Sequence, residues 1–125
     1  MGKRVLLIED EPNIVEAVRY LLTREGWAVD THSNGATALD AVARRRPDVI
    51  VLDAMLPGRS GFDILRDLRT APDTSAIPVL MLTARGQRRD REMAEAAGAS
   101  RFMTKPFSNS DIVDCLRELG GHDAA

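Results

Sequence analysis

The chain has 125 residues, of which 44% are apolar and 29% charged, and its formal net charge is −2. This length suits one domain with a buried core. The net charge offers no basic field, so direct binding of nucleic acid by this chain is not expected. No apolar stretch is long enough to span a bilayer, and the single cysteine, Cys115, cannot form an internal disulfide. We therefore expect a cytoplasmic protein that does not contact membranes.

Short apolar runs alternate with helical patterns along the chain. The first half predicts a strand at 5–8, a helix begun by Pro12 and ended by Gly26, a strand at 27–31, a helix capped by Asn34 and stopped by Pro47, and a strand at 49–52. The second half predicts a helix opened by Ser60 or Gly61, a strand at 79–82, a helix at 87–97 ended by Gly98, a strand at 101–104, and a helix ended by Gly120 and Gly121.

Alternating strands and helices of this kind predict an α/β fold. A parallel sheet with helices on both faces follows, because each strand is connected to the next through a helix. Right-handed crossovers leave few strand orders, and in such doubly wound sheets ligands bind outside the carboxyl ends of the strands. The side chains that follow each predicted strand are therefore the candidates for function.

Those strand ends carry acids, a hydroxyl and an amine. Glu9 and Asp10 follow the first strand, Asp53 the third, Thr83 the fourth and Lys105 the fifth. Three neighbouring carboxylates need a counter-charge, which a divalent cation such as Mg²⁺ can supply. A carboxylate can also act as a nucleophile towards phosphorus, with a lysine and a hydroxyl holding phosphoryl oxygens. The pattern indicates phosphoryl transfer to Asp53.

Each of these residues alone has an ordinary structural interpretation. Asp53 could be a solvated acid at a strand end, and the pair Glu9–Asp10 could cap the next helix. Thr83 could be a turn residue, and Lys105 a surface lysine. The joint pattern favours a site, because every group falls at the same end of a different strand.

Four segments resemble the receiver domain of two-component response regulators. They are LLIEDEP (6–12), VLDAMLPGRSGFDIL (51–65), MLTA (81–84) and TKPF (104–107). The resemblance implies a flavodoxin-like, (βα)5 domain with strand order 2-1-3-4-5 over residues 1–121, followed by a flexible tail at 122–125. It also implies that a histidine kinase or a histidine phosphotransferase donates the phosphoryl group, and that the domain then controls a downstream effector.

The resemblance assigns roles at the acidic end of the sheet. Asp53 matches the phosphoacceptor, Asp10 the acid that binds Mg²⁺ (or Mn²⁺) directly, and Glu9 the acid that usually acts through water. The main-chain carbonyl of Met55 matches the third protein ligand. Met55 and Arg85 lie two residues after the phosphoacceptor and the switch hydroxyl, where we expect side chains to tune the lifetime of the phosphate.

The same resemblance identifies a switch. Thr83 matches the switch hydroxyl, Lys105 the phosphate-pairing lysine, and Phe102 the switch aromatic. The family typically has a cis bond between Lys105 and Pro106. Such a domain is not a conventional enzyme, although it catalyses its own phosphorylation and dephosphorylation.

Some positions depart from the common pattern. Glu9 replaces the more usual aspartate, and Phe102 lacks the hydroxyl of tyrosine. Ala99-Ser100-Arg101 stands where many transcription-factor receivers carry acids of a dimer face, so that particular dimer is not implied. The alternative function is a receiver-like interaction module that works without phosphorylation. An aspartyl-phosphate phosphatase is disfavoured by Met55, where a second acid would be needed, and a flavodoxin by the acidic turn EDEP.

Overall fold

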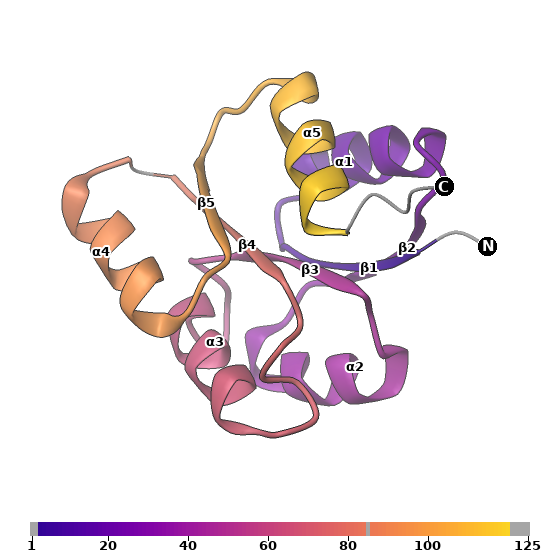
Figure 1. The fold of residues 1–125 in the computed structure, drawn as a ribbon. Coiled ribbons are helices and arrows are strands. Elements are labelled where there is room, and N and C mark those ends of the chain that lie inside the picture. Colours follow the sequence, from indigo (N-terminus) through magenta and orange to yellow (C-terminus); the bar gives the residue numbers. More distant parts are fainter. Residues whose placement is uncertain (1–2, 85, 121–125) are drawn as a thin grey trace.

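A computed structural model describes residues 3–84 and 86–120 of the chain. Within them, parallel strands form one sheet in the order β2-β1-β3-β4-β5 (Figure 1). The strands are β1 (Arg4–Ile8), β2 (Ala28–His32), β3 (Val49–Asp53), β4 (Val79–Thr83) and β5 (Arg101–Thr104). The strand order and the parallel pairing confirm the flavodoxin-like, doubly wound fold that the sequence predicts.

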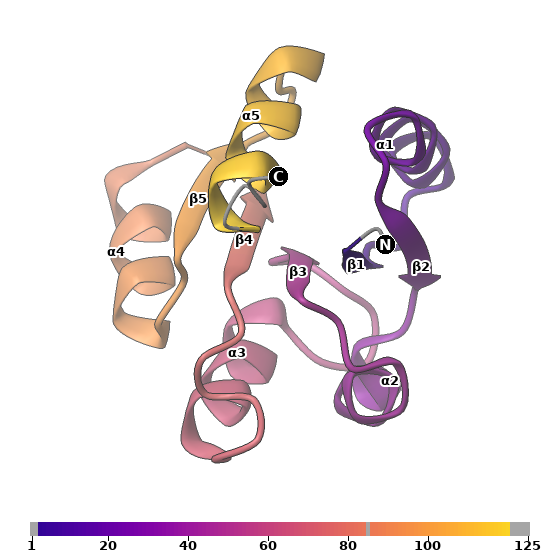
Figure 2. The ribbon, with the colours of Figure 1, turned by 45° about the vertical axis from the view of Figure 1, so that its right-hand side comes forward.

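Helices cover both faces of the sheet. They are α1 (Pro12–Arg24), α2 (Ala38–Arg45), α3 (Gly61–Thr70), α4 (Arg88–Ala97) and α5 (Asn109–Leu119), with a short 3₁₀ helix (Gly35–Thr37) before α2. Helices α1 and α5 pack on one face, and α2, α3 and α4 pack on the other (Figures 1 and 2). Among the described residues, no helix has the length and the apolar character needed to cross a membrane.

The core consists of two layers separated by the sheet. Leu6 and Ile8 of β1 point into the layer under α2 and α3, whereas Val5 and Leu7 point into the layer under α1 and α5. Every residue of β3 and β4 is buried, since both strands have helices on either side. Such strands are continuous apolar runs instead of alternating ones. A charged side chain is therefore accommodated only where a central strand ends, as at Asp53.

The boundaries of the helices and strands agree closely with the sequence prediction, except that the predicted second helix begins as a 3₁₀ helix. Asn34 acts as a cap, but its Oδ1 accepts a hydrogen bond from Ala36 N (2.8 Å) and caps the 3₁₀ helix, so α2 begins only at Ala38. Ser60 caps α3, and the second strand starts one residue later than predicted. The predicted stop at Gly121 and the tail at 122–125 lie outside the described residues.

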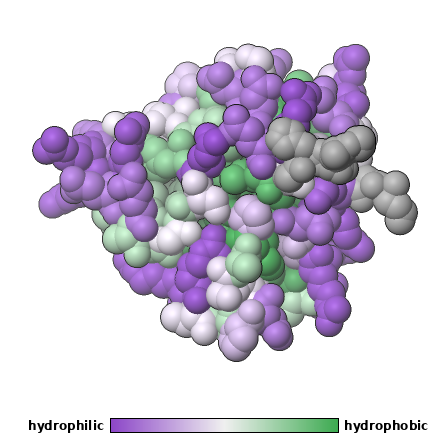
Figure 3. All heavy atoms as spheres, in the orientation of Figure 1, coloured by the Kyte–Doolittle hydropathy of each residue, from purple (hydrophilic) through white to green (hydrophobic). Residues whose placement is uncertain are grey.

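The outer surface of α4 is strongly polar. Figure 3 shows hydrophilic side chains gathered at the left edge of the molecule, where Figure 1 places this helix. The exposed residues there include Arg88, Arg89, Glu92 and Glu95. Arg88 and Glu92 form an exposed ion pair (3.9 Å), which contributes little to stability. The mixed charges are consistent with a solvated helix face.

Candidate functional site

The ends of the central strands bring the predicted site residues together. Ile8 of β1 is in register with Leu52 of β3, so Glu9 and Asp53 follow at the same level of the sheet. Asp53 in turn pairs with Leu82 of β4, which precedes Thr83. Asp53 and Thr83 are each the last residue of a strand. Parallel pairing thus places these groups at one edge of the sheet.

Three acids form a cluster at this edge. Each of Glu9, Asp10 and Asp53 has a carboxylate oxygen within 4.8 Å of the others. Glu9 and Asp53 are only 1% and 3% exposed, whereas Asp10 is exposed to solvent. The backbone N–H of Met55 donates to Asp53 Oδ1 (3.1 Å). The predicted acid cluster therefore exists, with one solvent-facing member.

Glu9 does not cap the helix that follows it. Its Oε2 accepts a hydrogen bond from Glu11 N (3.1 Å), and Glu11 is itself the residue before α1. No side chain caps the start of α1. The interpretation of Glu9 and Asp10 as ordinary helix caps is therefore wrong, and Pro12 occupies the first helical turn instead.

Lys105 reaches into the acid cluster from the end of β5. Its Nζ lies 3.1 Å from Glu9 Oε1 and 3.4 Å from Asp53 Oδ1. The contact with Glu9 is an ion pair without hydrogen-bond geometry, so Oε1 is buried with no hydrogen-bond partner in the described structure. The peptide bond between Lys105 and Pro106 is cis, as the resemblance implies. The lysine thus provides the cation that two buried acids require.

Comparison with known proteins identifies this arrangement. Residues 5–117 match the family model of the response regulator receiver domain. The chain belongs to this family. This match covers β1 from Val5 onwards and all of the other four strands, and it includes every residue of the acid cluster.

Curated relatives are regulators that are longer than this receiver domain. The probable transcriptional regulatory protein TcrX of Mycobacterium tuberculosis is 44% identical over 92% of this chain and 48% of its own length. The phosphate regulon transcriptional regulatory protein PhoB of Rhizobium meliloti is 40% identical over 95% of this chain and 52% of its own length. The receiver domain therefore spans about half the length of these relatives.

Solved structures show the same architecture. The receiver domain of sensor histidine kinase PA1611 from Pseudomonas aeruginosa, which has a magnesium ion in its active-site cleft, superimposes with a TM-score of 0.89. It is 29% identical, and the match covers 97% of this chain and 99% of that one. The chemotaxis response regulator CheY4 of Vibrio cholerae gives a TM-score of 0.89 at 28% identity, covering 95% and 99% of the two chains.

The electrostatics of the receiver domain's site centre on Glu9. Burial, together with the charge of nearby Asp53, raises the pKa of Glu9 to about 7, although the hydrogen bond from Glu11 N and the contact with Lys105 act in the opposite direction. Burial lowers the pKa of Lys105, but the interactions with Glu9 and Asp53 outweigh it and leave that pKa above its ordinary value. At neutral pH Lys105 therefore stays charged, whereas the pKa of Glu9 lies close to the pH of the solution.

The acid cluster fits a hard divalent cation. Such cations bind carboxylate and carbonyl oxygens, and Mg²⁺ keeps several waters, for which an exposed ligand such as Asp10 leaves room. The buried Glu9 Oε1 is in an ion pair with Lys105 but accepts no hydrogen bond in the described structure, so a bound cation would complete its coordination. Direct ligation by the longer side chain of Glu9 is therefore as compatible with this structure as a water-mediated role.

The remaining predicted residues lie around this cluster. Thr83 is buried at the end of β4, and Phe102 is half-buried in β5 against the core under α4. Met55 projects into solvent, with 66% of its surface exposed. Arg85 lies outside the described residues. A cavity of about 500 Å³ borders Lys105, between α1 and the start of α5.

Sequence reasoning missed one contact of the receiver's switch region. The guanidinium carbon of Arg91 in α4 lies over the ring of Phe102, 5.8 Å from its centroid, which is a cation–π distance. The only signal in the sequence is the arginine-rich stretch RGQRRDRE at 85–92. Local sequence does not show which arginine of this stretch stacks on Phe102, because that depends on how α4 packs against β5.

Proposed function

We propose that this receiver domain accepts a phosphoryl group on Asp53 and changes conformation in response. The observation that carries the proposal is the position of Asp53. Its carboxylate is almost fully buried at the end of a central strand, between two further acids and the amine of Lys105. A structural acid has no need of two like charges beside it, whereas a phosphoacceptor needs both a metal site and a cation.

Each residue has a defined part in the proposed reaction. An oxygen of Asp53 attacks the phosphorus of a phosphohistidine, and the imidazole nitrogen leaves with the bonding electron pair. Glu9, Asp10, Asp53 and the Met55 carbonyl would hold a divalent cation, which would neutralise charge on the phosphoryl oxygens. Lys105, already 3.4 Å from Asp53 Oδ1, pairs with one of those oxygens. The hydroxyl of Thr83 donates to another.

The conformational response involves Thr83 and Phe102. A phosphoryl oxygen on Asp53 attracts the Thr83 hydroxyl. The movement of the Thr83 side chain then leaves space towards β5. Phe102 has no hydroxyl, so its present position rests on packing against the core and on Arg91 over its ring. The change is a shift between two packings of the α4 side of the sheet. The amide NMR signal of Thr83 and the aromatic signals of Phe102 should shift on phosphorylation. Unchanged chemical shifts would contradict the proposed switch.

A histidine kinase or histidine phosphotransferase is the proposed phosphodonor. It must bring an imidazole to the edge of the sheet beside Lys105, and the apolar cavity there adjoins that path. The phosphorylated receiver in turn controls a downstream effector. The relatives TcrX and PhoB are named as transcriptional regulatory proteins, and this chain matches about half the length of each.

Acetyl phosphate labelling tests the proposed function. The wild-type protein should gain one phosphoryl group in the presence of Mg²⁺ and none after chelation of the metal. Asp53→Asn should abolish the label, whereas Asp40→Asn, an exposed acid in the first turn of α2, should leave it intact. Labelling that persists in Asp53→Asn would refute the assignment. A protein that takes no label in any form would favour the alternative, an interaction module that works without phosphorylation.

A further inference from the structure

The loop between β3 and α3 follows Asp53 and is held at its tip by Gly35. The backbone N–H of Gly35, in the 3₁₀ helix, donates to Pro57 O (2.8 Å). A Cβ atom at Gly35 would lie 2.3 Å from Arg59 O and 2.9 Å from Arg59 N. Both are main-chain atoms, which cannot rotate away as a flexible side chain would. Gly35 therefore lets two backbone segments approach more closely than any other residue permits.

Gly58, on the loop, makes the reciprocal approach. Its φ is +88°, in the left-handed region that favours glycine. A Cβ atom there would lie 2.8 Å from Asn34 Oδ1 and 3.0 Å from Ala36 N. Asn34 Oδ1 is itself fixed by the hydrogen bond that it accepts from Ala36 N. We call Gly35 and Gly58, which pack against each other's segments, the glycine clasp.

The base of the same loop is closed beside Asp53. Gly61 N donates to Ala54 O (2.9 Å), and a Cβ atom at Gly61 would lie 2.2 Å from Asp53 O. Met55 lies between this closed base and the clasped tip, and its N–H donates to Asp53 Oδ1. The main chain at Met55 is thus fixed from both sides, although its side chain projects into solvent.

We propose that the glycine clasp is a positioning device, which fixes the main-chain carbonyl of Met55 as a ligand for the divalent cation. Neither glycine touches the metal or the phosphoryl group. The proposal rests on the proposed function, because it requires a cation at Glu9, Asp10 and Asp53. A loose loop would leave the three carboxylates in place and weaken only the main-chain ligand.

Calorimetric titration with Mg²⁺ tests the clasp. Gly35→Ala should weaken Mg²⁺ binding about tenfold, the lower end of the effect known for groups that orient metal ligands. Gly26→Ala is the matched control. Gly26 has a left-handed backbone (φ +96°), as Gly58 does, but a Cβ atom there would meet nothing within 4 Å, and the residue lies at the end of the sheet opposite the site. This control should lose stability and retain the wild-type affinity for Mg²⁺.

The outcomes separate the clasp from the proposed function. A folded Gly35→Ala protein that binds Mg²⁺ as tightly as wild type overturns the clasp, and so does an equal loss of affinity in Gly26→Ala. Where Gly35→Ala does not fold, Asn34→Ala removes the Oδ1 acceptor that holds Ala36 N in the segment facing Gly58, and it should weaken Mg²⁺ binding by a smaller factor. Unchanged affinity in that variant also overturns the clasp. A wild-type protein that binds no Mg²⁺ and takes no label would instead refute the proposed function.

Discussion

Glu9 is the residue whose ionisation opposes folding in the metal-free protein. It is buried beside Asp53, and these two causes raise its pKa to about 7. In the unfolded chain the same carboxyl titrates near its ordinary value of 4.5. The folded state therefore keeps a proton that the unfolded state has lost between these two values. The contribution of protonated Glu9 to the unfolding free energy is therefore fully present below pH 4.5, and it disappears as pH rises through about 7.

Glu9→Gln should remove this pH dependence. In the presence of a chelator, the unfolding free energy of wild type should fall by roughly 2 kcal/mol more than that of the variant between about pH 5 and pH 8. The comparison isolates Glu9, because all other titrating groups are shared. Urea denaturation at several pH values provides the measurement. Parallel profiles for the two proteins would show that Glu9 is not the group that titrates.

Met55 is an exposed residue placed to affect how long a phosphate on Asp53 survives. Its side chain is 66% exposed and lies two residues after Asp53. The apolar side chain offers no group that could orient an attacking water. Met55→Asn supplies an amide at this position and should change the rate of dephosphorylation by a few-fold or more. Loss of label after removal of acetyl phosphate gives this rate, and an unchanged rate would exclude a modulating role for Met55.

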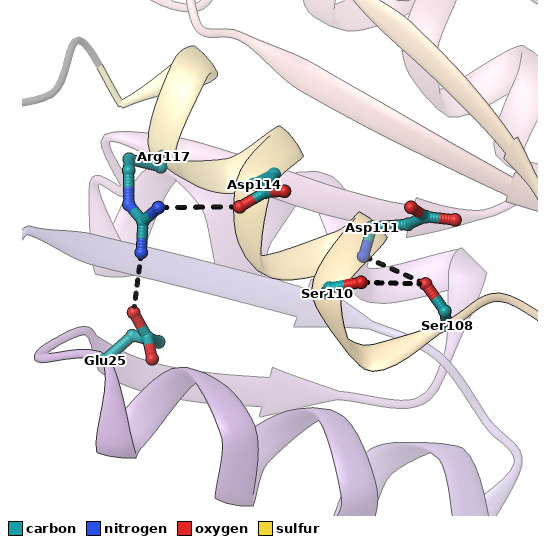
Figure 4. A network of polar contacts seen from close by, with 6 residues as sticks. All are labelled: Glu25, Ser108, Ser110, Asp111, Asp114 and Arg117. Atoms are coloured by element: carbon teal, nitrogen blue, oxygen red, sulfur yellow. Dashed lines mark hydrogen bonds and ion pairs between the residues drawn. The ribbon is translucent and has the colours of Figure 1, made fainter.

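Helices α3 and α5 of this receiver each begin with a serine cap. Ser108 precedes α5, and its Oγ accepts a hydrogen bond from Asp111 N (3.1 Å) (Figure 4). The other end of α5 is tied to the end of α1 by the ion pair between Arg117 and Glu25 (3.0 Å). Both ion-pair partners are well exposed, so the cap should contribute more than the ion pair.

Ser108→Ala should lower the unfolding free energy by about 1 kcal/mol, because one N–H of the first turn of α5 loses its acceptor. Ser108→Asp should retain most of the stability, since a carboxylate caps equally well. Ser110→Ala is the control, because the Ser110 hydroxyl contacts Ser108 Oγ (3.3 Å) but is not the group that caps α5. Denaturant unfolding of the three variants checks this order. Equal losses in Ser108→Ala and Ser110→Ala would contradict the capping role.

At the level of elements, local patterns predict most of what the structure shows. Central strands buried on both faces are continuous apolar runs, so their ends, and with them Asp53 and Thr83, are visible in the sequence. The 3₁₀ helix before α2 was missed, because Asn34 caps either type of helix. The stacking of Arg91 on Phe102 and the glycine clasp depend on how distant segments pack, and no local pattern encodes that.

For the whole molecule, the acid cluster links metal binding to folding. Three carboxylates converge only when the sheet is formed, so a cation that binds them stabilises the folded state selectively. In the metal-free state Lys105 partly compensates their charge. The sequence predicted the convergence, but assigned Lys105 to a phosphoryl oxygen only. Its ion pairs with Glu9 and Asp53 became visible in the folded structure.

Mg²⁺ should therefore raise the melting temperature of the wild-type protein. At about one hundred times the dissociation constant the stabilisation should be about 2.7 kcal/mol. Asp10→Asn should lose most of this effect without much change in metal-free stability, because Asp10 is exposed. Scanning calorimetry with increasing Mg²⁺ provides the measurement, and Asp40→Asn should behave as wild type. Equal stabilisation of Asp10→Asn would place the metal elsewhere.

The central claim is that the fold presents Asp53, and no other acid, as the phosphoacceptor. It is tested most directly by phosphorylating the protein with acetyl phosphate and Mg²⁺, reducing the acyl phosphate with borohydride, and mapping the modified residue by peptide mass spectrometry. The account predicts modification at position 53 alone. Modification at Glu9, at Asp10 or at an acid outside the cluster, with Asp53 unmodified, would contradict it.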